Sequence, residues 1–277
     1  MAEKENLIVR ESVYIPLPED YGLKEVLSMM TNSNLTIGYD FDKWYDYELK
    51  EPIIVDISPA TNSHILICGM SGSGKSFCEN ILFAKLALAD SKGEIYFADY
   101  KQDDQFAYLR SCSRYYPYKD TLKALEAVYE KLHKRLTNED KEKYPITLIW
   151  DEYIANILSL QNEDKKAATL AMNKVSEILM LGRSLSIRFF TSCQRAEASA
   201  FPLGCRINYG NILILGAPIR SIYEMLIPTE YIDKIGDRKF KTGEGIILLQ
   251  GSVLRFIKVP IIQNVDGMRE ICIKALS

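Results

Sequence analysis

One run of residues has the composition and spacing of a phosphate-binding loop. Residues 69–76 spell G-x-x-x-x-G-K-S and stand between an apolar run, 64–68, and a helical pattern that begins after Gly74. Backbone N–H groups can turn inward around phosphate oxygens only where glycines permit positive φ or close approach. The helix that follows directs its free N–H groups and positive dipole end at the same anion. These features predict a nucleoside triphosphate site rather than a glycine-rich turn that binds nothing.

The side chains of this loop have separate expected roles. Lys75 is expected to reach the β- and γ-phosphates, and the Ser76 hydroxyl is expected to ligate Mg²⁺. The predicted cofactors are therefore ATP and Mg²⁺. The residues expected to bind ATP in this segment are Gly69, Met70, Ser71, Gly72, Ser73, Gly74, Lys75, Ser76 and Phe77.

A pair of acidic residues ends a second apolar run, 146–150. Ligands of open α/β sheets bind at the carboxyl ends of the strands, so Asp151 is expected to hold the Mg²⁺ shell. Glu152 is suited to polarise the water that attacks the γ-phosphate. A glutamate there distinguishes hydrolytic motors from many nucleotide kinases, which favours ATP hydrolysis over phosphate transfer. The alternative is that the two acids only end the strand and cap the next helix.

Further polar residues follow another apolar run and a predicted helix. The run 187–191 leads to Gln194, which is expected to sense the γ-phosphate. Arg183 follows a predicted helix, where it can satisfy the helix C-terminus or reach into a neighbouring subunit's active site. Arg206 is a second candidate for such an arginine finger. The alternative is that both arginines are ordinary surface or salt-bridge residues.

Strand and helix patterns alternate along the chain. The near-continuous apolar, β-rich runs, which predict strands covered on both faces, are 52–57, 64–68, 94–98, 146–150, 187–191, 211–215 and 245–249. Apolar residues at three- and four-residue steps predict helices over 120–136 and 165–181, and a third helix is expected over 74–89. This alternation predicts an α/β fold with a mainly parallel β-sheet flanked by helices.

Composition and charge exclude several classes of protein. The hydrophobic share of 47% with 26% charged residues is that of a globular chain. No apolar run approaches the roughly 18 residues needed to span a bilayer, and no signal segment opens the sequence, so we expect a soluble, cytoplasmic protein without a membrane segment. Two histidines and scattered cysteines argue against triad hydrolysis and zinc chemistry.

Residues 1–33 are interpreted as an N-terminal extension or adaptor, and residues 34–277 as the main domain.

Any contact with DNA must be local, because the net charge is −3. Between residues 181 and 210 four arginines face one glutamate. A second basic stretch holds Lys234, Arg238, Lys239 and Lys241, which suits a loop beside a DNA backbone, although a solvated loop is the default interpretation. Tyrosine-rich patches at 44–47 and 115–118 can stack on bases or pack on a partly buried surface.

Five segments, taken in order, resemble the motor domain of the FtsK/SpoIIIE family of hexameric DNA translocases, which is related to HerA-type and conjugative coupling ATPases. The likeness extends over about residues 35–262. The segments are the lead-in 35–57, the phosphate loop 64–76, D-Y-K at 99–101 where the family has D-P-K, W-D-E-Y at 150–153, and T-S-C-Q-R at 191–195. The resemblance implies a RecA-like P-loop NTPase fold and adds Asp99 and Lys101 to the ATP site. Residues 241–245 correspond to a glycine-containing turn of the family.

The same resemblance implies a function. We expect an ATP-dependent DNA translocase that assembles as a homo-oligomer, a hexameric ring, and serves a mobile element, plasmid or phage. A relaxase or replication initiator is an expected partner. The membrane helices, long linker and winged-helix tail of the large members of the family have no counterpart in this sequence. The alternatives are a protein-secretion ATPase of the same superfamily and a monomeric P-loop kinase or nucleotide switch.

Overall fold

The computed structural model of the chain describes residues 34–59, 61–90, 92–142, 144–201 and 207–277. The predicted extension, 1–33, and the alternative finger residue Arg206 lie outside the described residues. The domain boundary at residue 34 therefore stays a prediction. None of the described helices is long and apolar enough to cross a membrane.

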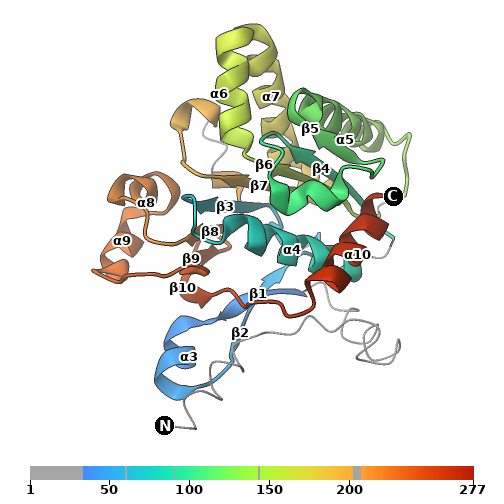
Figure 1. Cartoon of the computed structure of the whole chain (residues 1–277). Helices are drawn as coiled ribbons and strands as arrows, with labels where there is room; N and C mark the ends of the chain where they lie inside the picture. The colour runs from blue at the N-terminus through green and yellow to red at the C-terminus, as the bar shows by residue number, and fades with distance from the viewer. Residues whose placement is uncertain (1–33, 60, 91, 143, 202–206) are drawn as a thin grey trace.

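A ten-stranded sheet runs through the described part of the chain (Figure 1). Its order is β2-β1-β10-β9-β8-β3-β7-β6-β4-β5. The strands are β1 Asn34–Asp40, β2 Pro52–Asp56, β3 Ile65–Gly69, β4 Glu94–Asp99, β5 Tyr115–Pro117, β6 Ile146–Asp151, β7 Ile187–Cys193, β8 Asn211–Leu215, β9 Glu244–Leu249 and β10 Val253–Lys258. Neighbours from β8 to β5 are parallel, whereas β9, β10, β1 and β2 pair antiparallel. The predicted α/β class with a mainly parallel sheet is confirmed.

Helices cover both faces of the sheet because successive strand residues point to opposite sides. In β3, Ile65 and Ile67 belong to one apolar cluster and Leu66 and Cys68 to the other. The first cluster packs against α4 Lys75–Ala89 and α10 Val265–Leu276. The second includes α5 Thr121–Leu136, α6 Tyr153–Glu163, α7 Lys165–Leu181, α8 Arg220–Leu226 and α9 Thr229–Ile235. The short helix α3, Phe41–Tyr47, follows β1 (Figure 1).

The predicted elements agree with the structure to within one or two residues, with one exception in how a strand is covered. The strands β3, β6, β7 and β8 are buried along their full length, as their apolar runs predicted. In β2 burial alternates, with Ile53 and Val55 buried and Ile54 44% exposed. Coverage on both faces was therefore wrong for the run 52–57, because β2 is an antiparallel edge strand with one solvated face.

His64, immediately before β3, links two of the central parallel strands. Its Nδ1 accepts a hydrogen bond from the backbone N–H of Phe189 in β7, at 3.0 Å. Complete burial, with a smaller effect of the nearby Arg188 charge, lowers the pKa of His64 to about 3. The folded protein therefore keeps this imidazole neutral until the pH falls close to that value.

This burial makes the free energy of unfolding depend on pH. The unfolded chain protonates His64 below its ordinary pKa of 6.5, whereas the folded chain does so only near pH 3, so stability is lost as the pH falls. At about pH 5 this residue should account for a loss of about 2 kcal/mol. Urea unfolding at about pH 7.5 and about pH 5 measures it, with His64→Gln as the control. An equal pH effect in both proteins would contradict the prediction.

Candidate active site

The phosphate loop connects the end of β3 to the start of α4. Gly72 and Gly74 have φ of 81° and 91°, a region that favours glycine. A Cβ on Gly69 would lie 2.3 Å from the Ser73 Oγ, so the turn also needs the missing side chain. No side chain caps α4 at Gly74. The first N–H groups of α4 are therefore available to an anion.

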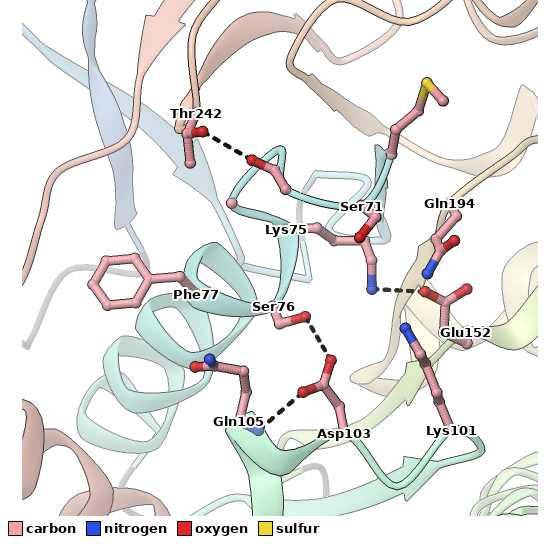
Figure 2. A pocket seen from close by; sticks show the side chains of 13 residues that line it. Ser71, Lys75, Ser76, Phe77, Lys101, Asp103, Gln105, Glu152, Gln194 and Thr242 are labelled. Carbon is pink, nitrogen blue, oxygen red and sulfur yellow. Dashed lines mark hydrogen bonds and ion pairs between the residues drawn. The ribbon is translucent and has the colours of Figure 1, made fainter.

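The lysine of the loop meets both acids at the end of β6. Lys75 Nζ lies 2.7 Å from Asp151 Oδ1 and 3.1 Å from Glu152 Oε1 (Figure 2 draws the second pair). The side chains of Lys75, Asp151 and Glu152 are 7%, 1% and 5% exposed. Ser192 of β7 completes the cluster, because its hydroxyl donates to Asp151 Oδ1 at 2.6 Å. Segments 76 residues apart in sequence thus converge on one buried cluster.

The charge of the Lys75 amine is held by its neighbours. Burial alone would lower the pKa of Lys75, but the nearby carboxyl groups of Asp151, Glu79 and Glu152 outweigh burial and raise it. Glu79 lies one turn further along α4, and burial, followed by the charge of Asp151, raises its pKa well above the ordinary value. The amine is therefore a permanent cation, and the cluster around it is rich in carboxyl groups.

Glu152 stands in an uncommon backbone conformation. Its φ of 55° and ψ of 38° are left-handed, which is costly for a residue with a Cβ and is found most often at functional sites. Glu152 occupies the N-cap position of α6, yet its side chain makes no capping hydrogen bond and pairs with Lys75 instead. The interpretation of this residue as a simple helix cap does not describe its side chain.

The donor atoms at this edge suit Mg²⁺. Asp151 Oδ2 is buried and has no hydrogen-bond partner among the described residues. Mg²⁺ prefers oxygen ligands and is usually held by one or two carboxylates with phosphate oxygens and water. In the described residues no group of three or more His, Cys, Asp or Glu could hold a metal ion. Ser76 and Asp151 are the residues that would hold the ion.

A cavity of about 340 Å³ opens beside the loop (Figure 2). Its walls are Met70, Ser71, Gly72, Gly74, Lys75, Ser76, Phe77, Lys101, Asp103, Gln105, Glu152, Gln194 and Thr242. Most of the predicted ATP-binding residues are among them. Gly69, Ser73, Asp99 and Asp151 do not line the cavity, and three of the lining residues, Asp103, Gln105 and Thr242, were not foreseen as site residues.

Asp99 does not line the cavity but holds the turn whose residues do. This buried side chain accepts hydrogen bonds from the Tyr115 hydroxyl and the Gln102 N–H, both at 2.6 Å. Burial raises the pKa of Asp99 to about 6, opposed by the Tyr115 hydrogen bond. The resemblance placed Asp99 in the ATP site, and in the structure its carboxylate holds the turn that carries Lys101 and Asp103. Tyr115, which could have stacked on bases, is itself buried in this arrangement.

A distant turn lies over the phosphate loop. The Thr242 hydroxyl donates to the carbonyl of Gly72 at 2.8 Å (Figure 2), and the Gly243 N–H donates to the carbonyl of Ser73 at 2.8 Å. The segment 241–245 was recognised as a glycine-containing turn, but nothing in the sequence indicated its partner. The local signal for Asp103 was its place two residues after Lys101, before the 3₁₀ helix η2, Asp104–Leu109.

The two remaining predicted residues lie in different places. Gln194 follows β7 and points into the cavity, on the same side as Glu152 (Figure 2). Arg183 lies in η4, Gly182–Leu185, directly before β7. It is therefore at the amino end of that strand, whereas the cavity is at the carboxyl ends of the parallel strands. Its side chain is exposed, and its Nε donates to the carbonyl of Pro59 at 3.4 Å. A contact of Arg183 with a neighbouring subunit's site stays a prediction.

Comparison with known families gives a match over most of the chain. A sequence model of the FtsK/SpoIIIE family matches residues 44–275. None of the curated proteins matches the chain.

Several solved structures share the fold. The pCW3 conjugation coupling protein TcpA, in its monomer form with ATPγS, is 16% identical with a TM-score of 0.69, over 94% of this chain and 75% of TcpA. The cytoplasmic domain of the Type VII secretion ATPase EccC of Thermomonospora curvata is 16% identical with a TM-score of 0.64, over 89% of this chain. EssC (ATPases 2 and 3) of Geobacillus thermodenitrificans is 14% identical with a TM-score of 0.63, over 88% of this chain.

These likenesses establish the fold. The chain spans 31% of the EccC structure and 49% of the EssC structure, so it corresponds to a part of each. The predicted RecA-like P-loop architecture is confirmed by these neighbours and by the family match.

The contact between Thr242 and the phosphate loop makes a testable contribution to stability. Thr242→Val keeps the shape of the side chain but removes the donor to the Gly72 carbonyl, so the free energy of unfolding should fall by about 1 kcal/mol. Amide hydrogen exchange in residues 70–74 should become faster. Urea unfolding and exchange mass spectrometry measure the two effects, with Thr242→Ser as the control that keeps the hydroxyl. If amide exchange in Thr242→Val were as slow as in the wild type, the hydrogen bond from Thr242 to Gly72 would not be what holds the phosphate loop in place.

Proposed function

The chain belongs to the FtsK/SpoIIIE family of P-loop ATPases, and on that premise we propose that it is a DNA translocase driven by ATP hydrolysis at Glu152. The observation that carries the proposal is the contact of Lys75 with both Asp151 and Glu152 at the edge of the sheet. The phosphate loop and a candidate base for water thereby line one cavity, and the carboxylate proposed to hold the metal, Asp151, lies buried beside them.

Binding of ATP requires Lys75 to exchange partners. The loop N–H groups and the N-terminus of α4 attract the phosphates, and the Lys75 amine must leave its carboxylates to reach them. Its departure frees the oxygens of Asp151 and Glu152. Mg²⁺, when bound through Ser76 and Asp151, offsets the charge that develops on the phosphate oxygens. Nucleotide binding therefore frees Asp151 to hold the metal and Glu152 to act as the base.

Hydrolysis then depends on residues that reach the cavity from three elements. Glu152, once free of Lys75, orients a water molecule and accepts its proton. Gln194 from the end of β7 and Lys101 from the turn after β4 point into the same space (Figure 2), which suits contacts with the γ-phosphate. Both side chains would thus register the presence or absence of that phosphate.

DNA is the proposed substrate of the motor. Support comes from the family and from the exposed Lys239 and Lys241, which lie close in sequence to the turn that contacts the phosphate loop. Arg238 is a weaker candidate, because it pairs with Asp42 and its guanidinium lies 3.9 Å from the Phe256 ring centroid. We propose a homo-oligomeric, hexameric ring in which Arg183 or Arg206 reaches a neighbour's site. A mobile element, plasmid or phage, with a relaxase or replication initiator as partner, is the proposed setting.

A protein-secretion ATPase is the second candidate. Its support is the structural likeness to EccC and EssC, which covers nearly as much of this chain as the likeness to TcpA. A monomeric P-loop kinase or nucleotide switch has less support, because Glu152 is a hydrolytic feature.

Substitution of the proposed base tests the chemistry. Glu152→Gln should bind ATP with affinity close to that of the wild type and hydrolyse it at least about 100-fold more slowly, because the amide cannot accept a proton. Lys75→Ala should weaken binding itself. Fluorescence titration with an ATP analogue and a phosphate-release assay separate the two effects. Normal turnover in Glu152→Gln would refute the assigned base.

The substrate is tested by stimulation of ATP hydrolysis. Duplex or single-stranded DNA should raise the hydrolysis rate several-fold in a salt-sensitive way, because the contacts are to phosphates. Substrate-like polypeptides should have no effect. Stimulation by a polypeptide alone would favour the secretion ATPase.

Light scattering in the presence of ATPγS tests the proposed hexameric ring. A protein that stays monomeric would support the nucleotide switch.

A further inference from the structure

We propose that Asp103 is a positioning residue for the metal in the ATP site, acting by accepting a hydrogen bond from the Ser76 hydroxyl. The inference rests on the proposed function, since it concerns how Mg²⁺ with ATP is held. Ser76 Oγ donates to Asp103 Oδ2 at 3.4 Å (Figure 2). A serine hydroxyl carries one proton and two lone pairs, so a hydroxyl that ligates a cation through a lone pair needs an acceptor for its proton. Asp103 is that acceptor.

The backbone around Asp103 fixes the direction of its carboxylate. Asp103 Oδ1 accepts the N–H of Gln105 at 3.0 Å and so caps η2. The Asp103 N–H itself donates to Asp99 Oδ1 at 3.4 Å, and Gln102 adopts a left-handed φ of 56°. With Oδ1 occupied by the cap, Oδ2 is directed at Ser76. The turn from Asp99 to Gln105 thus presents one oxygen to the phosphate loop.

Charge gives Asp103 a second effect on the metal. Asp103 and Glu152 are the two acidic side chains among the residues that line the cavity. A carboxylate in that wall repels the phosphates of metal-free ATP and attracts a divalent cation. Asp103 should therefore make ATP binding more dependent on Mg²⁺, by weakening binding without the metal and strengthening it with the metal. Mutation of a residue that hydrogen-bonds to a metal ligand, without touching the metal itself, typically lowers metal affinity about 10–100-fold.

The neighbouring residue offers a matched control. The Asp104 side chain is 100% exposed and makes one ion pair, with Arg110 at 3.7 Å. It does not line the cavity. Asp104→Asn therefore removes the same charge, one residue further along the chain, without touching Ser76.

The experiment measures the Mg²⁺ enhancement of ATP binding. For each protein the affinity for ATPγS is determined by calorimetry with excess Mg²⁺ and with EDTA, and Mn²⁺ affinity in the presence of ATPγS is determined by electron paramagnetic resonance. In Asp103→Asn the ratio of the two ATPγS affinities should fall about tenfold and Mn²⁺ should bind about tenfold more weakly. Asp104→Asn should match the wild type.

A second variant, with a different capping side chain, tests whether the effect depends on the carboxylate and not on the cap. Asp103→Ser keeps an oxygen that can cap η2 through the Gln105 N–H but has no carboxylate for Ser76. It should show the same reduced enhancement as Asp103→Asn while melting close to the wild-type temperature. A wild-type enhancement in both variants would overturn the proposal. An equal reduction of the Mg²⁺ enhancement in Asp104→Asn would also overturn it, because the effect would then come from the loss of any negative charge in this region.

Failure of the proposed function gives a different result. If the wild type bound no ATPγS under either condition, or if Lys75→Ala bound it equally well, the ATP site itself would be wrong. Binding that needs Lys75 but is indifferent to Asp103 would leave the ATP site intact and remove only the role of Asp103.

Discussion

A buried lysine held between two buried carboxylates organises this protein. Lys75 begins α4, Asp151 ends β6 and Glu152 precedes α6, so the ion pairs join the phosphate loop to the centre of the sheet. Removing one partner of such a buried group typically costs about 3–5 kcal/mol, because the remaining charges are left uncompensated. The amine can therefore leave only if something else balances the acids. A nucleotide with its divalent cation meets that condition, whereas the nucleotide alone adds more negative charge.

The parts of this arrangement that follow from local chemistry were predictable from sequence. The glycines of the loop are dictated by backbone conformation, and the strands that lead to the loop and to the acids are buried on both faces and therefore continuously apolar. The strand β2 was misjudged because a short apolar run does not reveal whether a strand lies inside a sheet or at its edge. Periodicity reports the burial of a segment, but not which neighbour buries it.

The residues that were missed depend on contacts between distant segments. Thr242 and Gly72 are 170 residues apart, and their hydrogen bond exists because β9 follows a turn that crosses the end of β3. Asp99 matched a family motif, but a motif states the residue type and not the direction of the side chain. Its carboxylate turns toward Tyr115 and the following loop, and the residues that this loop presents reach the cavity instead.

Two connections link the cavity to other parts of the described fold, and they differ in strength. Glu152 directly precedes α6 and has a left-handed backbone, so it is joined to that helix through the covalent chain. Thr242 and Gly243 are joined to the loop by two hydrogen bonds, each worth about 1 kcal/mol, and can detach without unfolding anything. In the proposed mechanism, the segment that carries Lys239 and Lys241 is therefore the part that can hold and release a substrate as the nucleotide changes. A motor that alternates between holding and letting go of its substrate needs the weaker of these two connections on the substrate side.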